Sequence, residues 1–303
     1  PLSLSFVKAG FKVVGFEEEK KKKEKIKKKK SYIWSISSKD ISDALSKGFD
    51  ATVDFSKISL VDVVIICVPT PLTKYGQPDL RYLVKSINSI MPYIKKGQLI
   101  SIESTTYPGT TEEELIPKLK QKGFILGKNI FVCYSPERED PGNESYSTRT
   151  IPKVIGANTK DCLKVAVSTY SAAIKKVVPV SSIKVAEMTK LHENIYRLIN
   201  IGLVNEMKMI CDKLKIDIHE VIKAASTKPF GFTPYYPGPG VGGHCIPIDP
   251  NYLTWKAKQF SIETRFINLA QTINKEMPYW ILDKLLEELN LRGKVLNNLK
   301  VLF

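Results

Sequence analysis

The chain has 303 residues, of which 43% are hydrophobic and 25% are charged, and its formal charge is +15. This length is enough for two domains with sizeable cores, and the composition excludes a disordered or fibrous chain. No apolar run is long enough to span a membrane and the first residues do not resemble a signal peptide, so we expect a cytoplasmic protein. Five widely spaced cysteines without a CxxC pair argue against a disulfide framework and a zinc site.

Most of the positive charge comes from Lys20–Lys30, where nine lysines and one glutamate occupy eleven positions. We expect a solvated helix face or a frayed loop here, because no aromatic residues interleave with the lysines. The alternative is a patch that binds polyphosphate or RNA, but no nucleic-acid recognition motif follows it. We therefore expect no nucleic-acid partner.

The chain begins with a helix, a strand and an acidic cluster. Pro1–Ala9 has the pattern of an amphipathic helix that ends at Gly10, and Phe11–Phe16 has that of a strand. This is the second half of a dinucleotide-binding unit, in which an acid after the second strand binds the adenosine ribose. The first strand and the GxGxxG turn are absent, so we expect a chain truncated at its front. Glu17 takes the position of the ribose-binding acid, unless it is a helix-start charge.

The alternation of strands and helices continues to residue 180. Helical patterns cover Ser38–Lys47, Leu80–Ile94, Thr111–Lys122 and Thr159–Ala173, and strand-like runs cover Val61–Val68, Gln98–Ser104, Ile130–Tyr134 and Lys153–Ile155. Thr110 or Thr111 is the expected cap of the helix over residues 111–122. This order predicts an α/β domain over residues 1–180 with a Rossmann-like doubly wound parallel sheet. Ligands bind such sheets at the carboxyl ends of the strands.

The second half is helical. Val185–Leu214 predicts a spine helix of about 45 Å, with apolar residues at Met188, Leu191, Ile195, Leu198 and Ile199. Further helices are expected over Asp217–Ala225, Tyr252–Gln259 and about Phe266–Asn290. We therefore expect an all-helical domain over residues 181–292. Gly293–Phe303 turns toward a strand, as if a further domain began there.

A loop rich in glycine and proline carries a cysteine. Pro237–Pro250, PGPGVGGHCIPIDP, contains four glycines and four prolines, so its backbone must approach something closely. Cys245 follows Gly242 and Gly243, and Asp249 lies four residues later. A thiol beside a carboxylate and bare backbone N–H groups is the environment of a nucleophile. The alternative is a buried cysteine in a turn.

This loop, with the preceding Phe230–Pro234, resembles the active-site segment of the nucleotide-sugar 6-dehydrogenases, the UDP-glucose and UDP-N-acetylhexosamine dehydrogenase family. The resemblance extends to CVPTPLTKYGQPDL (67–80), ESTTYPGTTEE (103–113), YSPEREDPGN (134–143) and VAEMTKLHENIYRLINIGLVNE (185–206). The segment SPEREDPGN and the cysteine loop look like the UDP-GlcNAc/UDP-ManNAc branch, although UDP-glucose remains open. The chain resembles the central two-thirds of a family member, so we expect a C-terminal UDP-binding domain to begin at residues 293–303.

The resemblance implies an NAD-dependent, four-electron oxidation of the sugar C6 alcohol to a carboxylate, for surface polysaccharide. Cys245 would form a thiohemiacetal and then a thioester, and Asp249 would activate or position water. Lys190 and Asn194 share one face of the spine helix and would stabilise the oxyanion and hold the sugar. The alternatives are an exposed helix face with Lys190 paired to Glu187 or Glu193, and Asp249 as a turn-former.

The resemblance also assigns residues at strand ends. Glu137 would handle protons through water, unless it forms a salt bridge within residues 137–140. Thr105 would lie near the nicotinamide and the catalytic water, Thr70 would contact the cofactor, and Glu17 would select NAD over NADP. Lys22 falls near the NAD pyrophosphate in relatives. Further substrate contacts are expected at Arg138, Arg197, Tyr236 and Gly242.

The expected partners are a UDP-sugar and a second copy of the chain, joined through the central helices as a homodimer. Two other hypotheses stay open. One is a catalytically inactive, dimerising remnant, which NAD binding would distinguish. The other is a two-electron 3-hydroxyacid dehydrogenase, which would need no Cys245 and would form one NADH per substrate. His192 and His219 are expected on helix surfaces, and His244 is not part of an evident triad.

Overall fold

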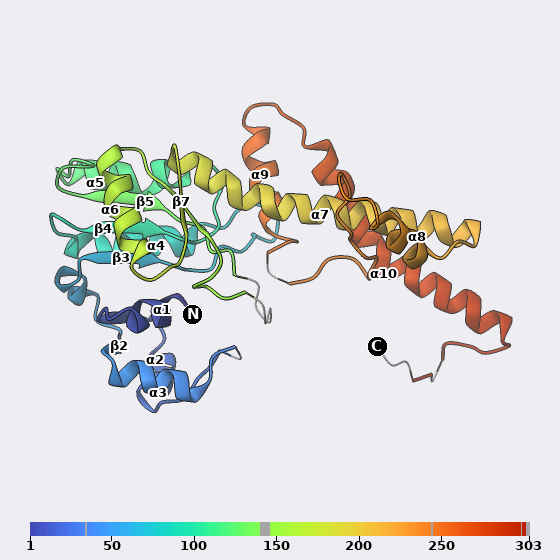
Figure 1. The fold of residues 1–303 in the computed structure, drawn as a ribbon, viewed down its shortest axis with the longest axis horizontal. Coiled ribbons are helices and arrows are strands. Elements are labelled where there is room, and N and C mark those ends of the chain that lie inside the picture. The colour runs from blue at the N-terminus through green and yellow to red at the C-terminus, as the bar shows by residue number, and fades with distance from the viewer. Residues whose placement is uncertain (34, 140–145, 244, 298, 301–303) are drawn as a thin grey trace. The chain divides into compact units, whose positions relative to one another are not determined.

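The structure is a computed structural model that describes residues 1–33, 35–139, 146–243, 245–297 and 299–300. It divides into two compact units, Pro1–Lys190 and Leu191–Phe303. Helix α7 (Ile183–Leu214) begins in the first unit and continues into the second (Figure 1). None of the helices in the described ranges is long and apolar enough to cross a membrane.

The first unit contains two sheets. In the smaller one, β1 (Val13–Phe16) pairs in parallel with β2 (Phe49–Thr52). The larger sheet has the order β3-β4-β5-β6-β7, with bounds Val63–Ile66, Leu99–Ile102, Phe131–Tyr134, Lys153–Gly156 and Val177–Val180. The α/β prediction is confirmed, with two differences from a single parallel sheet: β1 and β2 form a sheet of their own, and β5 and β6 pair antiparallel, at Tyr134 and Gly156.

The helices of the first unit follow the predicted order but are shorter. They are α1 (Leu2–Lys8), α2 (Lys20–Lys27), α3 (Ser38–Ser46), α4 (Arg81–Ile90), α5 (Ile116–Gln121) and α6 (Lys160–Ser171). Short 3₁₀ turns cover Phe55–Leu60 and Met91–Tyr93, and a π-helical turn covers Thr111–Leu115. Strands β2 and β7 were not predicted. Pro179 lies within β7, which is tolerable because β7 is the edge strand of its sheet.

Both faces of the larger sheet are covered. Ile100 and Ile102 of β4 pack with Ile87 of α4 and Leu119 of α5, whereas Leu99 packs with residues of α6. Alternate residues of a strand point to opposite faces, so the fully buried β4 is apolar at nearly every position. This is the doubly wound arrangement that the alternating pattern predicts.

The lysine-rich stretch is helix α2, anchored by one residue. Ile26 is buried and packs with Ile36, Ile41 and Ala51. The lysines of the stretch are exposed or half-buried. The expected solvated helix face is therefore confirmed, and the polyanion-binding alternative is not tested by this packing.

Thr110 occupies the expected N-cap position, but its side chain makes no capping hydrogen bond. Its hydroxyl donates instead to the carbonyl of Tyr107 at 2.7 Å. The N–H groups of Gly109 and Thr111 instead donate to the carboxylate of Glu187, at 2.6 and 3.0 Å. A carboxylate from α7 thus occupies the positive end of this turn. Sequence spacing could not show this, because Glu187 is 78 residues from Gly109.

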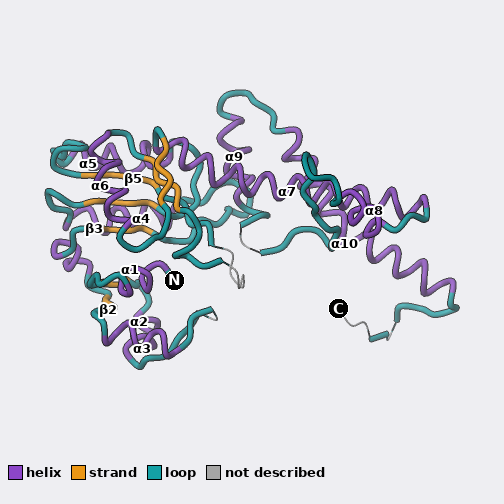
Figure 2. Tube along the Cα trace, in the orientation of Figure 1, coloured by secondary structure: helices purple, strands orange, loops and turns teal. Residues whose placement is uncertain are grey.

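Helices are the regular secondary structure in the described residues of the second unit: Figure 2 draws this unit in purple and teal, without the orange of strands. Besides α7 it contains α8 (Ile218–Ala225), α9 (Asp249–Lys258) and α10 (Arg265–Leu291). Of the predicted apolar positions of the spine helix, Leu191, Ile195 and Leu198 are buried, whereas Met188 is exposed and Ile199 is half-buried. The strand expected over residues 293–303 does not form in residues 293–297 and 299–300, where no partner strand is present; residues 298 and 301–303 lie outside the described part.

Candidate active site

The cysteine lies in an irregular loop, as predicted. The described residues between α8 and α9 form no helix or strand, and Cys245 is exposed, so the alternative of a buried cysteine is wrong. The carbonyl of Cys245 accepts hydrogen bonds from the N–H groups of Ile248 (3.1 Å) and Asp249 (2.9 Å). Cys245 therefore sits at the turn that leads into α9, while its neighbour His244 lies outside the described residues.

Asp249 is the first residue of α9 and is buried. Its Oδ2 atom accepts a hydrogen bond of 2.5 Å from Nδ2 of Asn194, which is also buried, on the spine helix. The carboxylate thus starts a helix, as a turn-former would, but it is also oriented by a neutral amide. A buried carboxylate four residues after an exposed thiol is suited to act on water or on a proton beside that thiol.

Lys190 precedes Asn194 by one helical turn, so both side chains leave the same side of α7. Only 8% of Lys190 is exposed, which is unusual for a lysine and argues against the alternative of an exposed helix face. Glu187, one of its expected ion partners, instead receives the two backbone bonds at Gly109 and Thr111.

Three other expected substrate contacts lie on the surface of the second unit. Arg197 and Gly242 are exposed, and Tyr236 is exposed and stacks on the ring of His219 with centroids 6.3 Å apart. His192 and His219 are exposed on α7 and α8, as predicted. The roles assigned to Arg197, Tyr236 and Gly242 stay predictions.

In the first unit, Glu137 follows β5 and is held from both sides. Its Oε1 atom accepts from the N–H groups of Arg138 (2.8 Å) and Glu139 (3.0 Å), and its Oε2 atom lies 3.6 Å from Nζ of Lys153. The ion partner of Glu137 thus comes from β6, outside the residues 137–140 that were considered. Nη1 of Arg138 donates to the carbonyl of Pro152 at 2.6 Å, which ties the two segments together.

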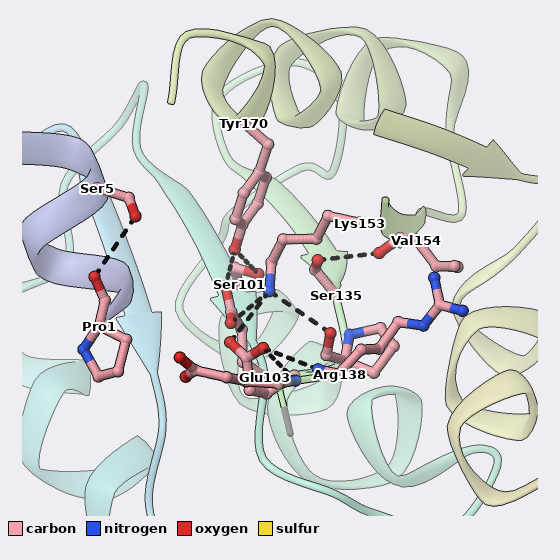
Figure 3. A network of polar contacts seen from close by, with 12 residues as sticks. Pro1, Ser5, Ser101, Glu103, Ser135, Arg138, Lys153, Val154 and Tyr170 are labelled. Atoms are coloured by element: carbon pink, nitrogen blue, oxygen red, sulfur yellow. Dashed lines mark hydrogen bonds and ion pairs between the residues drawn. The ribbon is translucent and has the colours of Figure 1, made fainter. Parts of the chain in front are cut away.

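Lys153 belongs to a buried polar network that sequence reasoning missed (Figure 3). Its ammonium donates to Oε2 of Glu103 at 2.8 Å and to the carbonyl of Pro136 at 3.4 Å. The Tyr170 hydroxyl bonds to the other oxygen of Glu103 and, at 2.9 Å, to Ser101. The available signal was a lysine at the start of an apolar strand and a glutamate at the end of one.

Burial dominates the ionisation of this network. It raises the pKa of Glu103, although the Lys153 ammonium opposes it, and it raises the pKa of the Tyr170 hydroxyl. Burial also disfavours the Lys153 ammonium, but the carboxylates of Glu103 and Glu137 outweigh it and raise its pKa. The ammonium therefore stays charged, and its single positive charge faces both Glu103 and Glu137.

The expected cofactor residues follow the carboxyl ends of parallel strands. Glu17 comes directly after β1, Thr70 lies four residues after β3, and Thr105 lies three residues after β4; all three are half-buried. Helix α2 begins at Lys20 with Glu19 as its cap residue, so Glu17 is not a helix-start charge. Oε1 of Glu17 accepts from the Tyr32 hydroxyl at 3.0 Å. Burial, reinforced by Glu17, raises the pKa of Tyr32 to about 12.

These residues fit part of a dinucleotide. A carboxylate at a strand end is the acceptor that ribose hydroxyls need, and Glu17 supplies one at the expected place. Lys22, expected near the pyrophosphate, pairs with Glu19 at 2.8 Å, and the hydrogen bond to Glu19 raises its pKa. An approaching phosphate would have to compete with that carboxylate for Lys22.

Comparisons with known proteins find matches over most of the chain. Residues 1–174 match the NAD binding domain of the UDP-glucose/GDP-mannose dehydrogenase family, and residues 184–276 match its central domain. The chain is 41% identical to Protein CapL of Staphylococcus aureus over 244 residues, which is 80% of this chain and 57% of CapL. It is 35% identical over 289 residues to UDP-N-acetyl-D-glucosamine 6-dehydrogenase of Pseudomonas aeruginosa, covering 95% of this chain and 67% of that protein.

The fold matches solved structures as well. A UDP-D-ManNAc dehydrogenase from Pyrococcus horikoshii superimposes with a TM-score of 0.89 at 31% identity, over 96% of this chain and 69% of that one. The chain thus spans between about half and two thirds of the relatives it matches. The two domain matches together show that this chain belongs to the UDP-glucose/GDP-mannose dehydrogenase family, whose domain matched by residues 1–174 binds NAD.

Proposed function

We propose that this chain is the catalytic part of an NAD-dependent nucleotide-sugar 6-dehydrogenase that oxidises a UDP-N-acetylhexosamine, UDP-GlcNAc or UDP-ManNAc, to the uronic acid. The observation that carries this proposal is the buried Asp249, oriented by Asn194 and joined through its N–H to the carbonyl of the exposed Cys245. The sugars named for the Pseudomonas and Pyrococcus relatives support the substrate class.

The proposed chemistry uses the thiol of Cys245 as a nucleophile. NAD, when bound, accepts a hydride from sugar carbon C6 in each of two oxidations. Between them, the Cys245 thiolate adds to the C6 aldehyde: a C–S bond forms, and the carbonyl π electrons move to oxygen. A primary amide has two N–H donors, so Asn194 can hold Asp249 and still donate to that oxygen, with the Lys190 ammonium beside it.

Release of the product needs water and a base. After the second oxidation the sugar is held as a thioester on Cys245. Water adds to the thioester carbon and its proton passes to the Asp249 carboxylate. The C–S bond then breaks with its electron pair going to sulfur, which regenerates the thiolate and frees the carboxylic acid. The burial of Asp249 and its bond to Asn194 would keep this base in one orientation.

We further propose that the chain acts as a cytoplasmic homodimer joined through its central helices and that its product enters surface polysaccharide. On α7, exposed apolar side chains recur at Leu203, Met207, Ile210 and Leu214, a spacing of three and four residues that makes one stripe. An exposed apolar stripe of this kind is typical of a helix that packs against a partner.

The test is the number of NADH molecules formed per sugar by the 303-residue chain, with UDP-GlcNAc, UDP-ManNAc and UDP-glucose compared. We expect two NADH per sugar, and at most one with Cys245→Ala, because the second oxidation needs the thiol adduct. Asp249→Asn should slow hydrolysis and leave a covalent adduct on Cys245 that mass spectrometry detects. Preference for UDP-glucose would assign the chain to the other branch of the family.

Two outcomes would contradict the proposal. One NADH per substrate, unaffected by Cys245→Ala, would favour a two-electron dehydrogenase. If no NADH forms and calorimetric titration detects no NAD binding, a catalytically inactive, dimerising chain is favoured.

A further inference from the structure

Two buried asparagines of the second unit connect the cysteine loop to two helices. Nδ2 of Asn205, on α7, donates to Oδ1 of Asn274, on α10, at 2.9 Å. Nδ2 of Asn274 in turn donates to the carbonyl of Leu198 at 3.2 Å, and Oδ1 of Asn205 accepts from the N–H of Gly238 at 2.9 Å. The result is an unbroken chain of hydrogen bonds from the loop backbone to the α7 backbone.

Backbone groups at both ends fix the orientation of the two amides. Only an oxygen can accept from the N–H of Gly238, so Nδ2 of Asn205 must face Asn274. Only a nitrogen can donate to the carbonyl of Leu198, so Oδ1 of Asn274 must face Asn205. Asn205 and Asn274 are both buried, and a buried amide without partners would cost about 1–3 kcal/mol. An apolar or acidic residue at position 205 or 274 would interrupt this series of hydrogen bonds.

The loop also lies directly against α10. A Cβ atom on Gly240 would be 2.3 Å from the carbonyl oxygen of Asn274, and Gly240 has a φ of +99°. No other residue type fits such an approach without displacing backbone. Pro278, four residues after Asn274, has no N–H to donate to that carbonyl, which leaves this side of the helix open to the loop.

The spine helix therefore holds the loop at two points. Asn205 binds Gly238 before Cys245, and Asn194 binds Asp249 after it. These two asparagines are eleven positions apart on α7, about 16 Å along a helix, and Gly238 and Asp249 are also eleven positions apart. An extended chain of that length would span more than twice as far, about 36 Å. The loop must fold back between its two attachments, and Cys245 lies in this folded segment.

We propose that Asn205 and Asn274 are positioning residues that hold the loop so that the Cys245 thiol is presented in one place. The proposal rests on the proposed function for its catalytic consequence, but not for the anchoring itself. Because both side chains are neutral, the hydrogen bonds that anchor the loop do not depend on pH. Carboxylates at these two positions would make them depend on pH.

A matched pair of loop variants tests the anchor without disturbing the asparagines. A Cβ on Gly238 meets no atom within 4 Å, so Gly238→Ala keeps the N–H and adds only a methyl group. Gly238→Pro also adds a Cβ, and it removes the N–H that donates to Oδ1 of Asn205. Asn205→Ala removes the acceptor, and Asn200→Ala changes another asparagine of α7, which bonds only its own helix at Tyr196.

The readout is amide hydrogen exchange at Gly240–Gly243, followed by mass spectrometry. We expect Gly238→Pro and Asn205→Ala to accelerate exchange there at least tenfold, and Gly238→Ala and Asn200→Ala to change it less than twofold. In active protein, the first two variants should lower kcat at least tenfold with KM changed less than threefold, because they misplace the thiol and do not remove a substrate contact.

Two results would overturn the proposal. Loop exchange within twofold of Gly238→Ala in both test variants would show that Asn205 does not anchor the loop. Faster exchange throughout α8 and α10 as well would show a general structural role in place of local positioning. Amide exchange requires neither NAD nor sugar, so it reports on the anchor alone. If the proposed function is wrong, NADH formation will be absent while the exchange results still show the anchor.

Discussion

The two units of the chain bury different kinds of polar group. In the first unit the central ones are charged: Glu103 and Lys153 form an ion pair, and Glu187 binds backbone N–H groups. In the described part of the second unit they are the amides of Asn194, Asn205 and Asn274 and one carboxylate, Asp249, held by an amide. Ionisation should therefore govern the stability of the sheet unit far more than that of the helical unit.

The largest loss of unfolding free energy should come from Lys153→Met. This change leaves Glu103 buried without its cation, and removing one partner of a buried ion pair costs about 3–5 kcal/mol. We expect that loss of unfolding free energy in urea denaturation followed by circular dichroism. The double variant Glu103→Gln/Lys153→Met, which removes both charges, should recover most of it. A loss below about 1 kcal/mol in the single variant would show that the pair stabilises no more than a surface salt bridge.

The second largest change in unfolding free energy should come from the titration of Glu187. Burial, which outweighs the N–H groups of Gly109 and Thr111, raises the pKa of Glu187 to about 7, from an ordinary value near 4.5. Between these values Glu187 holds a proton in the folded chain that it has lost in the unfolded chain, so its contribution to stability is fully present below pH 4.5 and is lost as pH rises to 7. At about 1.4 kcal/mol per pH unit, the total approaches about 3 kcal/mol.

Glu187→Gln isolates this contribution, because the amide does not titrate. Urea denaturation of both proteins from pH 4.5 to 8 should show the wild type losing stability relative to the variant as pH increases. A constant difference across this range would mean that Glu187 remains ionised in the folded protein.

The smallest loss of unfolding free energy should come from Asp249→Asn in the second unit. The new side-chain oxygen can still accept from Nδ2 of Asn194, so one charge-assisted hydrogen bond becomes a neutral one. We expect a loss of about 1 kcal/mol in unfolding free energy, measured as for Lys153→Met. A loss as large as that of Lys153→Met would abolish the distinction between the two units.

Local pattern predicted most of the elements and one part of the site. The spine helix was expected over Val185–Leu214 and covers Ile183–Leu214, because its apolar periodicity is long and uninterrupted. The cysteine loop was predicted from its glycines and prolines, whose allowed backbone conformations exclude helix and strand. Thr70 and Thr105 were chosen from the family resemblance and not from local pattern, and their roles, like that of Glu17, stay predictions.

What was missed depends on contacts distant in sequence. Lys153 meets Glu103 across 50 positions, and Asn205 meets Asn274 across 69. Local sequence patterns do not show such pairings, because a lysine or an asparagine has the same local preferences with or without a partner that is distant in sequence. Strand β2 was missed for another reason: Phe49–Thr52 is short, and its Asp50 interrupts the apolar run.

The single antiparallel pair in the larger sheet has a consequence for how the first unit comes apart. Ladders such as β3-β4 register four residue pairs, but β5 and β6 register only Tyr134 with Gly156. Across this seam the connection relies on side chains: the Ser135 hydroxyl donates to the carbonyl of Val154, and the N–H of Val132 donates to Sγ of Cys162 on α6. Helix α6 packs against both strands of this pair, and we expect amide exchange under native conditions to begin between β5 and β6.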